Sequence, residues 1–129
     1  MPGKKPLTLP EMKDYTLVGY PPCSTCRKAQ AYLESRGIRL PMRDIKAQPP
    51  TAEELERWIA LSGKPIEKWF NTSGMRYREL NLKEKVKTAP REELLRLLAS
   101  DGMLVKRPIL VGGDRAVCGF KEAEWEALL

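Results

Sequence analysis

Hydrophobic positions near the start of the chain predict a short buried strand that leads directly into an amphipathic helix. Residues 15–20 (YTLVGY) are largely aromatic, β-branched or apolar, and two prolines follow them. In residues 24–35, apolar positions recur at the spacing of one helix face, at Cys26, Ala29 and Leu33. Gly37 is a typical residue for ending such a helix. We therefore expect a strand, a tight turn and a helix in succession.

Residues 38–45 predict a second strand, although their alternation of apolar and polar positions is imperfect. Pro41 lies inside this run, and a proline cannot donate a hydrogen bond to a neighbouring strand. We therefore expect part of this strand to lie at the edge of a sheet. Gln48 and two prolines end it.

The middle of the chain, about residues 51–100, has a mostly helical pattern. Thr51 and Glu54 have the spacing of a capping box, and apolar positions at helical spacing follow until Gly63. We expect a short helix from Pro65 and a loop with weak helical character over residues 71–82. A leucine-rich helix is expected from residues 88–90 to residue 100.

The last part of the chain predicts a hairpin and a closing helix. Residues 109–111 and 116–118 are apolar and are separated by a Gly-Gly-Asp-Arg turn, and residues 121–129 have helical spacing. A Cys-x-x-Cys motif also opens the first helix. Together these elements predict an α/β fold over residues 15–129, a thioredoxin-like mixed sheet flanked by helices, with a helical insertion at about residues 51–100.

Length and composition fit one compact domain, since the chain has 129 residues of which 42% are hydrophobic. Residues 1–14 carry several prolines and lysines and predict a flexible basic N-terminal tail. No apolar run is long enough to span a membrane, and the start lacks the apolar core of a secretory signal. We therefore expect a cytoplasmic protein without membrane contact.

Lys and Arg exceed Asp and Glu by 23 to 17, which gives a net charge of +6, and the chain has no histidine. The positive charge is compatible with nucleic acid, an acidic protein or an oxyanion as ligand. Because the charge is spread along the chain, we expect a solvated surface, a few cations near an anionic sulfur, and no direct nucleic acid binding. The lack of histidine excludes imidazole bases and imidazole zinc ligands.

The clearest chemical motif is CSTC at residues 23–26, because the predicted helix begins at its first cysteine. Unpaired backbone N–H groups and the helix dipole stabilise a thiolate there, and Arg27 and Lys28 add positive charge. Cys23 is therefore the candidate nucleophile. Cys26 lies one turn further on and can attack the same sulfur, which makes it the candidate resolving thiol of a Cys23–Cys26 redox disulfide.

Two other interpretations of the cysteines stay open. A zinc site would need ligands from Cys118 and carboxylates, since there is no second Cys-x-x-Cys motif, and we expect no metal. The cysteines could instead be inert core residues, which fits Cys26 on the apolar helix face better than Cys23 at the helix tip. Cys118 lies in an apolar strand, so we expect a core residue rather than a third redox partner.

Arg107-Pro108 is the second informative motif. In thioredoxin-like folds a proline that follows a cis peptide bond precedes the third strand and lies opposite the two cysteines, so by analogy we expect a cis bond here. The Arg107 guanidinium would then lie near the thiolate, where it could hold that thiolate or bind an oxyanion. The alternative is that Arg107 only solvates the end of the strand.

Three segments in order, YPPCSTCRKAQAYLESRGI, FNTSGMRYRELNL and LVKRPILV, resemble the ArsC/Spx family of thioredoxin-fold proteins. The resemblance extends from about residue 15 to residue 128. This family includes glutaredoxin-coupled arsenate reductases and Spx-type transcriptional regulators. The resemblance implies the same fold that the order of elements predicts.

The resemblance to arsenate reductases implies a nucleophilic cysteine, matched by Cys23, and three arginines that bind the oxyanion. Arg107 matches one arginine, whereas the other two positions fall at the uncharged residues Asn71 and Gly119. Arsenate binding would then need charge from a shifted position, at Arg76, Arg78 or Arg115. A second cysteine such as Cys26 is usually absent from these reductases, in which glutathione resolves the adduct.

The two cysteines followed by Arg-Lys-Ala resemble the Spx-type branch instead. This resemblance implies a disulfide switch and binding to the C-terminal domain of the RNA polymerase α subunit. Gly63 falls about where Spx-type proteins carry a glycine at that interface, although helix capping alone also favours glycine there. Spx-type regulators tend to carry a basic tail, whereas this sequence ends at Leu129 after its last predicted helix.

Two functions follow as hypotheses. The first is a thiol–disulfide oxidoreductase or arsenate-reductase-like protein that uses Cys23, Cys26 and Arg107, with no bound cofactor. Its reductant would be thioredoxin, or glutathione with glutaredoxin. The second is an Spx-type redox-sensing regulator that binds the RNA polymerase α subunit. The sequence favours the first.

Overall fold

Four short strands form a mixed sheet in the computed structural model, which describes Met12 and residues 14–128. The strands are β1 (Thr16–Gly19), β2 (Met42–Asp44), β3 (Ile109–Val111) and β4 (Ala116–Cys118). Their order across the sheet is β2-β1-β3-β4; β2 is parallel to β1, and β3 is antiparallel to both of its neighbours. The helix α2 (Ser24–Ser35) joins the first two strands, and α7 (Glu122–Glu126) follows the last. The predicted thioredoxin-like arrangement is confirmed.

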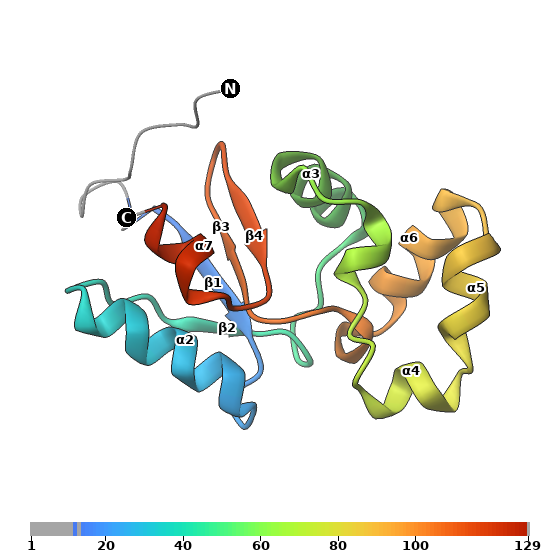
Figure 1. Cartoon of the computed structure of the whole chain (residues 1–129), viewed down its shortest axis with the longest axis horizontal. Helices are drawn as coiled ribbons and strands as arrows, with labels where there is room; N and C mark the ends of the chain where they lie inside the picture. The colour runs from blue at the N-terminus through green and yellow to red at the C-terminus, as the bar shows by residue number, and fades with distance from the viewer. Residues whose placement is uncertain (1–11, 13, 129) are drawn as a thin grey trace.

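Different helices cover the two faces of this sheet (Figure 1). Leu17 of β1 pairs with Leu110 of β3, and both pack in a core cluster with side chains of α2 and with Trp125 of α7. The next positions, Val18 and Ile109, pair with each other and belong to a second cluster formed with the middle helices. Successive side chains of a strand point to opposite faces, so β1 and β3 contribute to both clusters.

The predicted helical insertion covers the second face and is confirmed (Figure 1). Its elements are α3 (Ala52–Ser62), η1 (Ile66–Trp69), α4 (Met75–Glu79), α5 (Leu82–Thr88), α6 (Arg91–Ser100) and the short turn η2 (Gly102–Leu104). The sequence pattern alone does not distinguish α5 as a helix of its own. Pro90 separates it from α6, because proline disfavours the helical conformation in the residue before it, and Ala89 is extended at ψ 151°.

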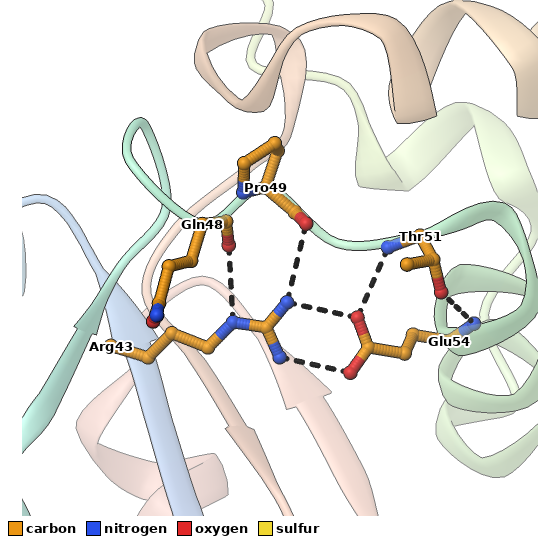
Figure 2. Close-up of polar contacts among 5 residues, drawn as sticks. All are labelled: Arg43, Gln48, Pro49, Thr51 and Glu54. Carbon is orange, nitrogen blue, oxygen red and sulfur yellow. Dashed lines mark hydrogen bonds and ion pairs between the residues drawn. The ribbon is translucent and has the colours of Figure 1, made fainter.

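Arg43 of the edge strand β2 forms hydrogen bonds with the first turn of α3 (Figure 2). The predicted capping box is complete, since the Glu54 N–H donates to Thr51 and the Thr51 N–H donates to the Glu54 carboxylate, each at 3.0 Å. Arg43 donates two hydrogen bonds to the same carboxylate, both at 2.9 Å, and two more to the carbonyls of Gln48 and Pro49. One carboxylate therefore joins the helix cap to the sheet.

Two predicted elements are shorter in the structure. The strand β2 spans Met42–Asp44 rather than residues 38–45, because Pro41 has no N–H to donate to β1. Ile38 and Leu40 are still buried, although they lie outside the strand. The strand lies at the sheet edge, as expected. The helix α7 spans Glu122–Glu126 rather than residues 121–129.

Most of the predicted basic tail, residues 1–11 and 13, lies outside the described residues, as does residue 129. Met12 is fully buried in the cluster beside α2 and α7, and its carbonyl accepts a hydrogen bond from the Tyr15 N–H at 3.0 Å. Among the helices that the structure describes, none combines the length and the apolar character needed to cross a membrane.

Candidate active site

Cys23 is the N-cap residue of α2, as the sequence predicts. The chain leaves β1 and turns, and the Cys23 N–H donates to the Tyr20 carbonyl at 2.8 Å. The Cys23 carbonyl accepts from the Arg27 N–H at 3.0 Å, so its backbone begins the helix while its thiol stays outside the helical turn. The thiol is free and half-buried, which leaves it accessible to a substrate.

Cys26 lies one turn further along α2 and is fully buried. Its sulfur accepts a hydrogen bond from the Tyr20 N–H at 3.4 Å. A Cβ atom at Gly19 would be only 3.1 Å from this sulfur, so the thiol lies directly against the end of β1. Both cysteines are free in the structure, which therefore describes the dithiol state.

The two thiols differ in acidity. Burial raises the pKa of Cys23, but hydrogen bonds from the Cys26 N–H, the Cys26 thiol and the Arg107 guanidinium outweigh it, so the pKa lies below its ordinary value. Burial raises the pKa of Cys26 to about 12, and the neighbouring Cys23 sulfur contributes to this rise. At neutral pH the accessible sulfur is therefore the more nucleophilic one.

Arg107 lies beside Cys23, and the peptide bond between Arg107 and Pro108 is cis, as expected. The guanidinium carbon of Arg107 is 5.4 Å from the centre of the Tyr20 ring, a distance at which a cation and a ring face attract each other. The Nε and Nη1 atoms are buried and have no hydrogen-bond partner within the described part of the chain. The guanidinium therefore has donors available for an anionic group next to the Cys23 sulfur.

The cations that the sequence places on α2 have a smaller role than expected. Arg27 and Lys28 are exposed, and neither is among the principal causes of the lowered pKa of Cys23. The guanidinium of Arg107 supplies this charge instead, because it lies close enough to the Cys23 sulfur to lower its pKa.

An open cleft of about 620 Å³ extends from Cys23 and Arg107 to the insertion. It is lined by residues from four parts of the chain: Cys23, Thr25, Gly63, Lys64, Pro65, Lys68, Asn71, Ser73, Lys106, Arg107, Cys118, Gly119, Phe120, Lys121 and Glu124. Five of these side chains are cationic and one is a carboxylate. The structure thus brings together the predicted residues Cys23 and Arg107 with four lysines that sequence reasoning missed.

Asn71 and Gly119, which match the other two arginine positions of arsenate reductases, both line this cleft. Gly119 has φ +79°, and a Cβ atom there would be 2.7 Å from the Cε of Lys106. A longer side chain at Gly119 is therefore disfavoured by the left-handed backbone, and it would also require the flexible Lys106 side chain to move. The expected substitutes do not reach the cleft: Arg76 pairs with Glu79 and Asp101, and neither Arg78 nor Arg115 lines it.

The missed lysines could not be found by periodicity. Lys64, Lys68 and Lys121 occupy polar positions near helix ends, where lysine is common, and only the contact across the fold gives them a shared location. Lys106 offered one cue, since it directly precedes Arg107.

Cys118 is a core residue, as predicted. Its side chain is buried, burial raises its pKa, and its sulfur is 3.8 Å from the Lys68 carbonyl. It also forms part of the cleft wall. Among the residues described, no three His, Cys, Asp or Glu side chains are placed to hold a metal ion.

The comparisons with known proteins agree on one family. Residues 18–128 match the ArsC family. The uncharacterized protein YusI of Bacillus subtilis is 50% identical over 86% of this chain and 94% of its own length. The global transcriptional regulator Spx of Streptococcus pneumoniae is 32% identical over 88% and 84%. A crystal structure from Streptococcus mutans, described as a possible arsenate reductase, superposes with a TM-score of 0.79 at 41% identity, covering 88% of this chain and 98% of that one.

Proposed function

The chain belongs to the ArsC family, and on that premise we propose that it is a thiol–disulfide oxidoreductase with Cys23 as its nucleophile. The observation that carries the proposal is the pairing of an accessible thiol of lowered pKa at the N-cap of α2 with a second, buried thiol one turn further along the same helix. A thiolate is the reactive form of cysteine, and a neighbouring thiol lets the protein release its product. Cys26 is the proposed resolving thiol.

In the first step the Cys23 thiolate attacks one sulfur of a substrate disulfide. A new S–S bond forms between Cys23 and the substrate, the substrate S–S bond breaks, and its second sulfur leaves as a thiolate that takes a proton from water. The free donors of Arg107 lie beside the sulfur at which negative charge is exchanged, so this guanidinium supports the entering and leaving charge.

In the second step Cys26 loses its proton to water and attacks the Cys23 sulfur. The Cys23–Cys26 disulfide forms, the mixed disulfide breaks, and the second substrate thiol is released, so two electrons have passed to the substrate. The first step favours the second, because the Cys23 thiolate that raises the pKa of Cys26 has become a neutral disulfide sulfur. The Tyr20 N–H then stabilises the Cys26 thiolate.

The proposed cycle closes when an external thiol reduces the Cys23–Cys26 disulfide. Thioredoxin, or glutathione with glutaredoxin, would supply the two electrons, and both systems fit the cytoplasmic location that the sequence predicts. No resident cofactor takes part in this scheme.

We favour a disulfide over arsenate as the substrate. Arg107 has the free donors that an oxyanion needs, but Asn71 and Gly119 bring no charge to the two other positions expected for arsenate. The site also provides a second thiol, Cys26, which an enzyme that relies on glutathione for resolution does not need.

Trapping of the mixed disulfide tests this proposal. The Cys26→Ser variant, treated with an excess of a small symmetric disulfide, is expected to hold one substrate thiol on Cys23, visible as an added mass. The native protein is expected to lose that mass and form an internal disulfide. Cys23→Ser is the control and should take up no thiol at neutral pH. Equal labelling of all three proteins would refute the assignment of Cys23 as nucleophile.

The second candidate is an Spx-type regulator in which the cysteine pair senses oxidation. The relatives named as transcriptional regulators favour it, with 32% identity to Spx of Streptococcus pneumoniae. Gly63 ends α3 at φ 71° and has open space around it, as a contact residue for the RNA polymerase α subunit would need.

A binding assay with the C-terminal domain of the RNA polymerase α subunit, under reducing and oxidising conditions, tests this candidate. Gly63→Arg is expected to abolish binding. Gly37→Arg is a matched control, since Gly37 also ends a helix with positive φ and open space around it. Lack of binding in both redox states would refute the regulator function.

A further inference from the structure

We propose that the cleft beside Cys23 recognises an acidic peptide segment, so that the preferred substrate is a disulfide flanked by carboxylate side chains. The proposal rests on the proposed thiol–disulfide exchange and names the substrate class for that site. It follows from the charge of the cleft, from the separate chain segments that supply its lysines, and from its size.

The charge of the cleft is strongly one-sided. Lys64, Lys68, Lys106 and Lys121 join Arg107 around it, against the single carboxylate of Glu124. That carboxylate is already paired, since its two oxygens are 3.3 and 3.4 Å from the Lys64 ammonium. The other three lysines have no ion pair with any residue that the structure describes. Three ammonium groups therefore remain for an anionic ligand.

These lysines come from separate parts of the chain. Lys64 and Lys68 lie between α3 and the end of η1, Lys106 precedes β3, and Lys121 precedes α7. No local sequence feature would bring them together. Their convergence around Cys23 and Arg107 gives a positive potential at the thiol, which attracts an anionic substrate and raises its rate of encounter.

The side chain of Lys106 lies beside Gly119 in the cleft. The carbon stem of Lys106 occupies the space in which a side chain at Gly119 would begin, 2.7 Å from a Cβ there. The Gly119 backbone is itself fixed, because its N–H donates to Pro108 at 2.8 Å and its carbonyl accepts from the Trp125 indole at 3.0 Å. The chain thus offers a lysine where arsenate reductases are expected to use an arginine.

The size of the cleft favours a peptide over a compact anion. A volume of about 620 Å³ lies within the range of sites that hold drug-sized ligands and far exceeds the space that a tetrahedral oxyanion needs. Thr25 and Ser73 also line it and provide hydroxyl groups for a peptide backbone. When a substrate cysteine forms the mixed disulfide with Cys23, acidic residues on either side of it in the peptide would place their carboxylates near the unpaired lysines.

Exchange rates with matched peptides test this proposal. Three short peptides that differ only in the two residues flanking one cysteine, Glu, Gln or Lys, are each converted to a mixed disulfide with 5-thio-2-nitrobenzoate. Attack by Cys23 releases the coloured thiolate, and its appearance gives the rate constant. At low salt we expect the acidic peptide to react about tenfold faster than the neutral one, and the basic peptide to react more slowly.

The preference is expected to shrink to about twofold in molar salt, because exposed charges are screened. Lys106→Gln with Lys121→Gln should reduce the ratio of acidic to neutral rates several-fold, and Lys121→Glu should reduce it more than Lys121→Gln does. The matched control is Lys83→Gln with Lys87→Gln, which removes two exposed lysines of α5 outside the cleft and should leave the ratio unchanged. Because each ratio is internal to one protein, partial misfolding of a variant does not imitate the effect.

Two results would overturn the proposal while the exchange function stands: equal rates for the acidic and neutral peptides, or an unchanged ratio in the cleft variants. The mixed disulfide of N-acetylcysteine amide, which has no carboxylate next to its thiol, is a further arm, and if it reacts as fast as the acidic peptide, the flanking residues contribute nothing and the peptide assignment is wrong. Failure of every disulfide to react faster with this protein than with free cysteine would instead refute the proposed function.

Discussion

The sulfur of Cys26 lies against the backbone of Gly19, where a Cβ atom would be 3.1 Å from it. The same Cβ would be 3.2 Å from the sulfur of Met42. Because Gly19 ends β1 without a side chain, the buried thiol fits beneath the strand and reaches the Tyr20 N–H at 3.4 Å. The position of the proposed resolving thiol therefore depends on a residue that has no side chain.

Gly19→Ala is expected to slow resolution of the mixed disulfide. The added methyl group meets Cys26 and Met42 at distances shorter than ordinary contacts, so the thiol must shift, and the overpacking should cost about 1–3 kcal/mol of unfolding free energy. Urea denaturation measures the stability, and the lifetime of the added mass on Cys23 measures resolution.

The control for this change is Gly113→Ala in the turn between β3 and β4. Gly113 has open space around its missing Cβ, so alanine should alter neither stability nor resolution there. If Gly19→Ala resolves the mixed disulfide as fast as Gly113→Ala, the packing of Cys26 does not govern that step.

Arg107→Gln is expected to make Cys23 less reactive at neutral pH. The guanidinium lowers the pKa of Cys23, so its loss raises that pKa and moves the rise of alkylation rate to higher pH. At pH 7 the thiolate fraction falls, and the rate of alkylation by iodoacetamide should drop several-fold. At a pH well above the new pKa the rates of both proteins should converge.

Arg27→Gln is the matched control for that experiment. Arg27 is exposed on α2 and is not a principal cause of the lowered pKa, so its profile should nearly coincide with that of the native protein. A larger shift in Arg27→Gln than in Arg107→Gln would favour the helix cations that the sequence suggests over the guanidinium.

Alkylation should also distinguish the three cysteines of the folded protein. Burial raises the pKa of Cys26 and of Cys118, and both side chains are shielded, whereas Cys23 is half-buried. Mass spectrometry at neutral pH is expected to find one rapid label on the reduced protein and three in denaturant. Rapid labelling of Cys118 in the folded state would contradict its place in the core.

Arg43 and Glu54 are expected to be coupled in stability. Their side chains are 22% and 30% exposed, and two hydrogen bonds join them, so a double-mutant cycle with Arg43→Gln and Glu54→Gln should give about 1 kcal/mol of coupling. Glutamine at position 54 can still complete the capping box, which separates the ion pair from the cap.

The same pair should respond to acid. The hydrogen bond from Arg43 lowers the pKa of Glu54 in the folded protein, so its contribution to stability is present above the pKa of the unfolded chain. That contribution is lost as the pH falls through the lower, folded value. Urea denaturation between pH 7 and pH 3 should therefore show a smaller acid-induced loss in Arg43→Gln than in the native protein.

The sequence predicts the elements well where local chemistry decides them. The helix at 24–35 and the capping box of α3 occur as predicted. Two prolines before the first helix, the capping threonine of α3 and a glycine after each helix set these boundaries locally. The limits of β2 and α7 are less predictable, since Pro41 and the packing of each element decide how far hydrogen bonding continues. The helix α5 is separate because Pro90 interrupts the helical conformation before α6, and the spacing of apolar residues alone does not show this break.

The site is predicted only in part. Cys23, Cys26 and Arg107 carry recognisable motifs, and the fold brings them together. The lysines of the cleft carry none, because their shared location depends on contacts between distant parts of the chain. The sequence likewise suggests Arg27 and Lys28 as the source of positive charge at the Cys23 thiolate, because they directly follow the motif. The larger effect of Arg107 can be recognised only once the fold is known.

The cleft has one wall from the insertion and one from the sheet. Lys64 and Lys68 lie in the segment that follows α3, whereas Cys23 and Arg107 lie at the ends of loops leading from and into sheet strands. Lys106 and Lys121 lie on the sheet side as well, so the positive charge of the cleft comes from both walls, whereas the two thiols come from one. Replacement of the segment after α3 by that of a homologue would therefore leave Cys23, Cys26 and Arg107 in place and change only the share of the cleft charge that Lys64 and Lys68 provide.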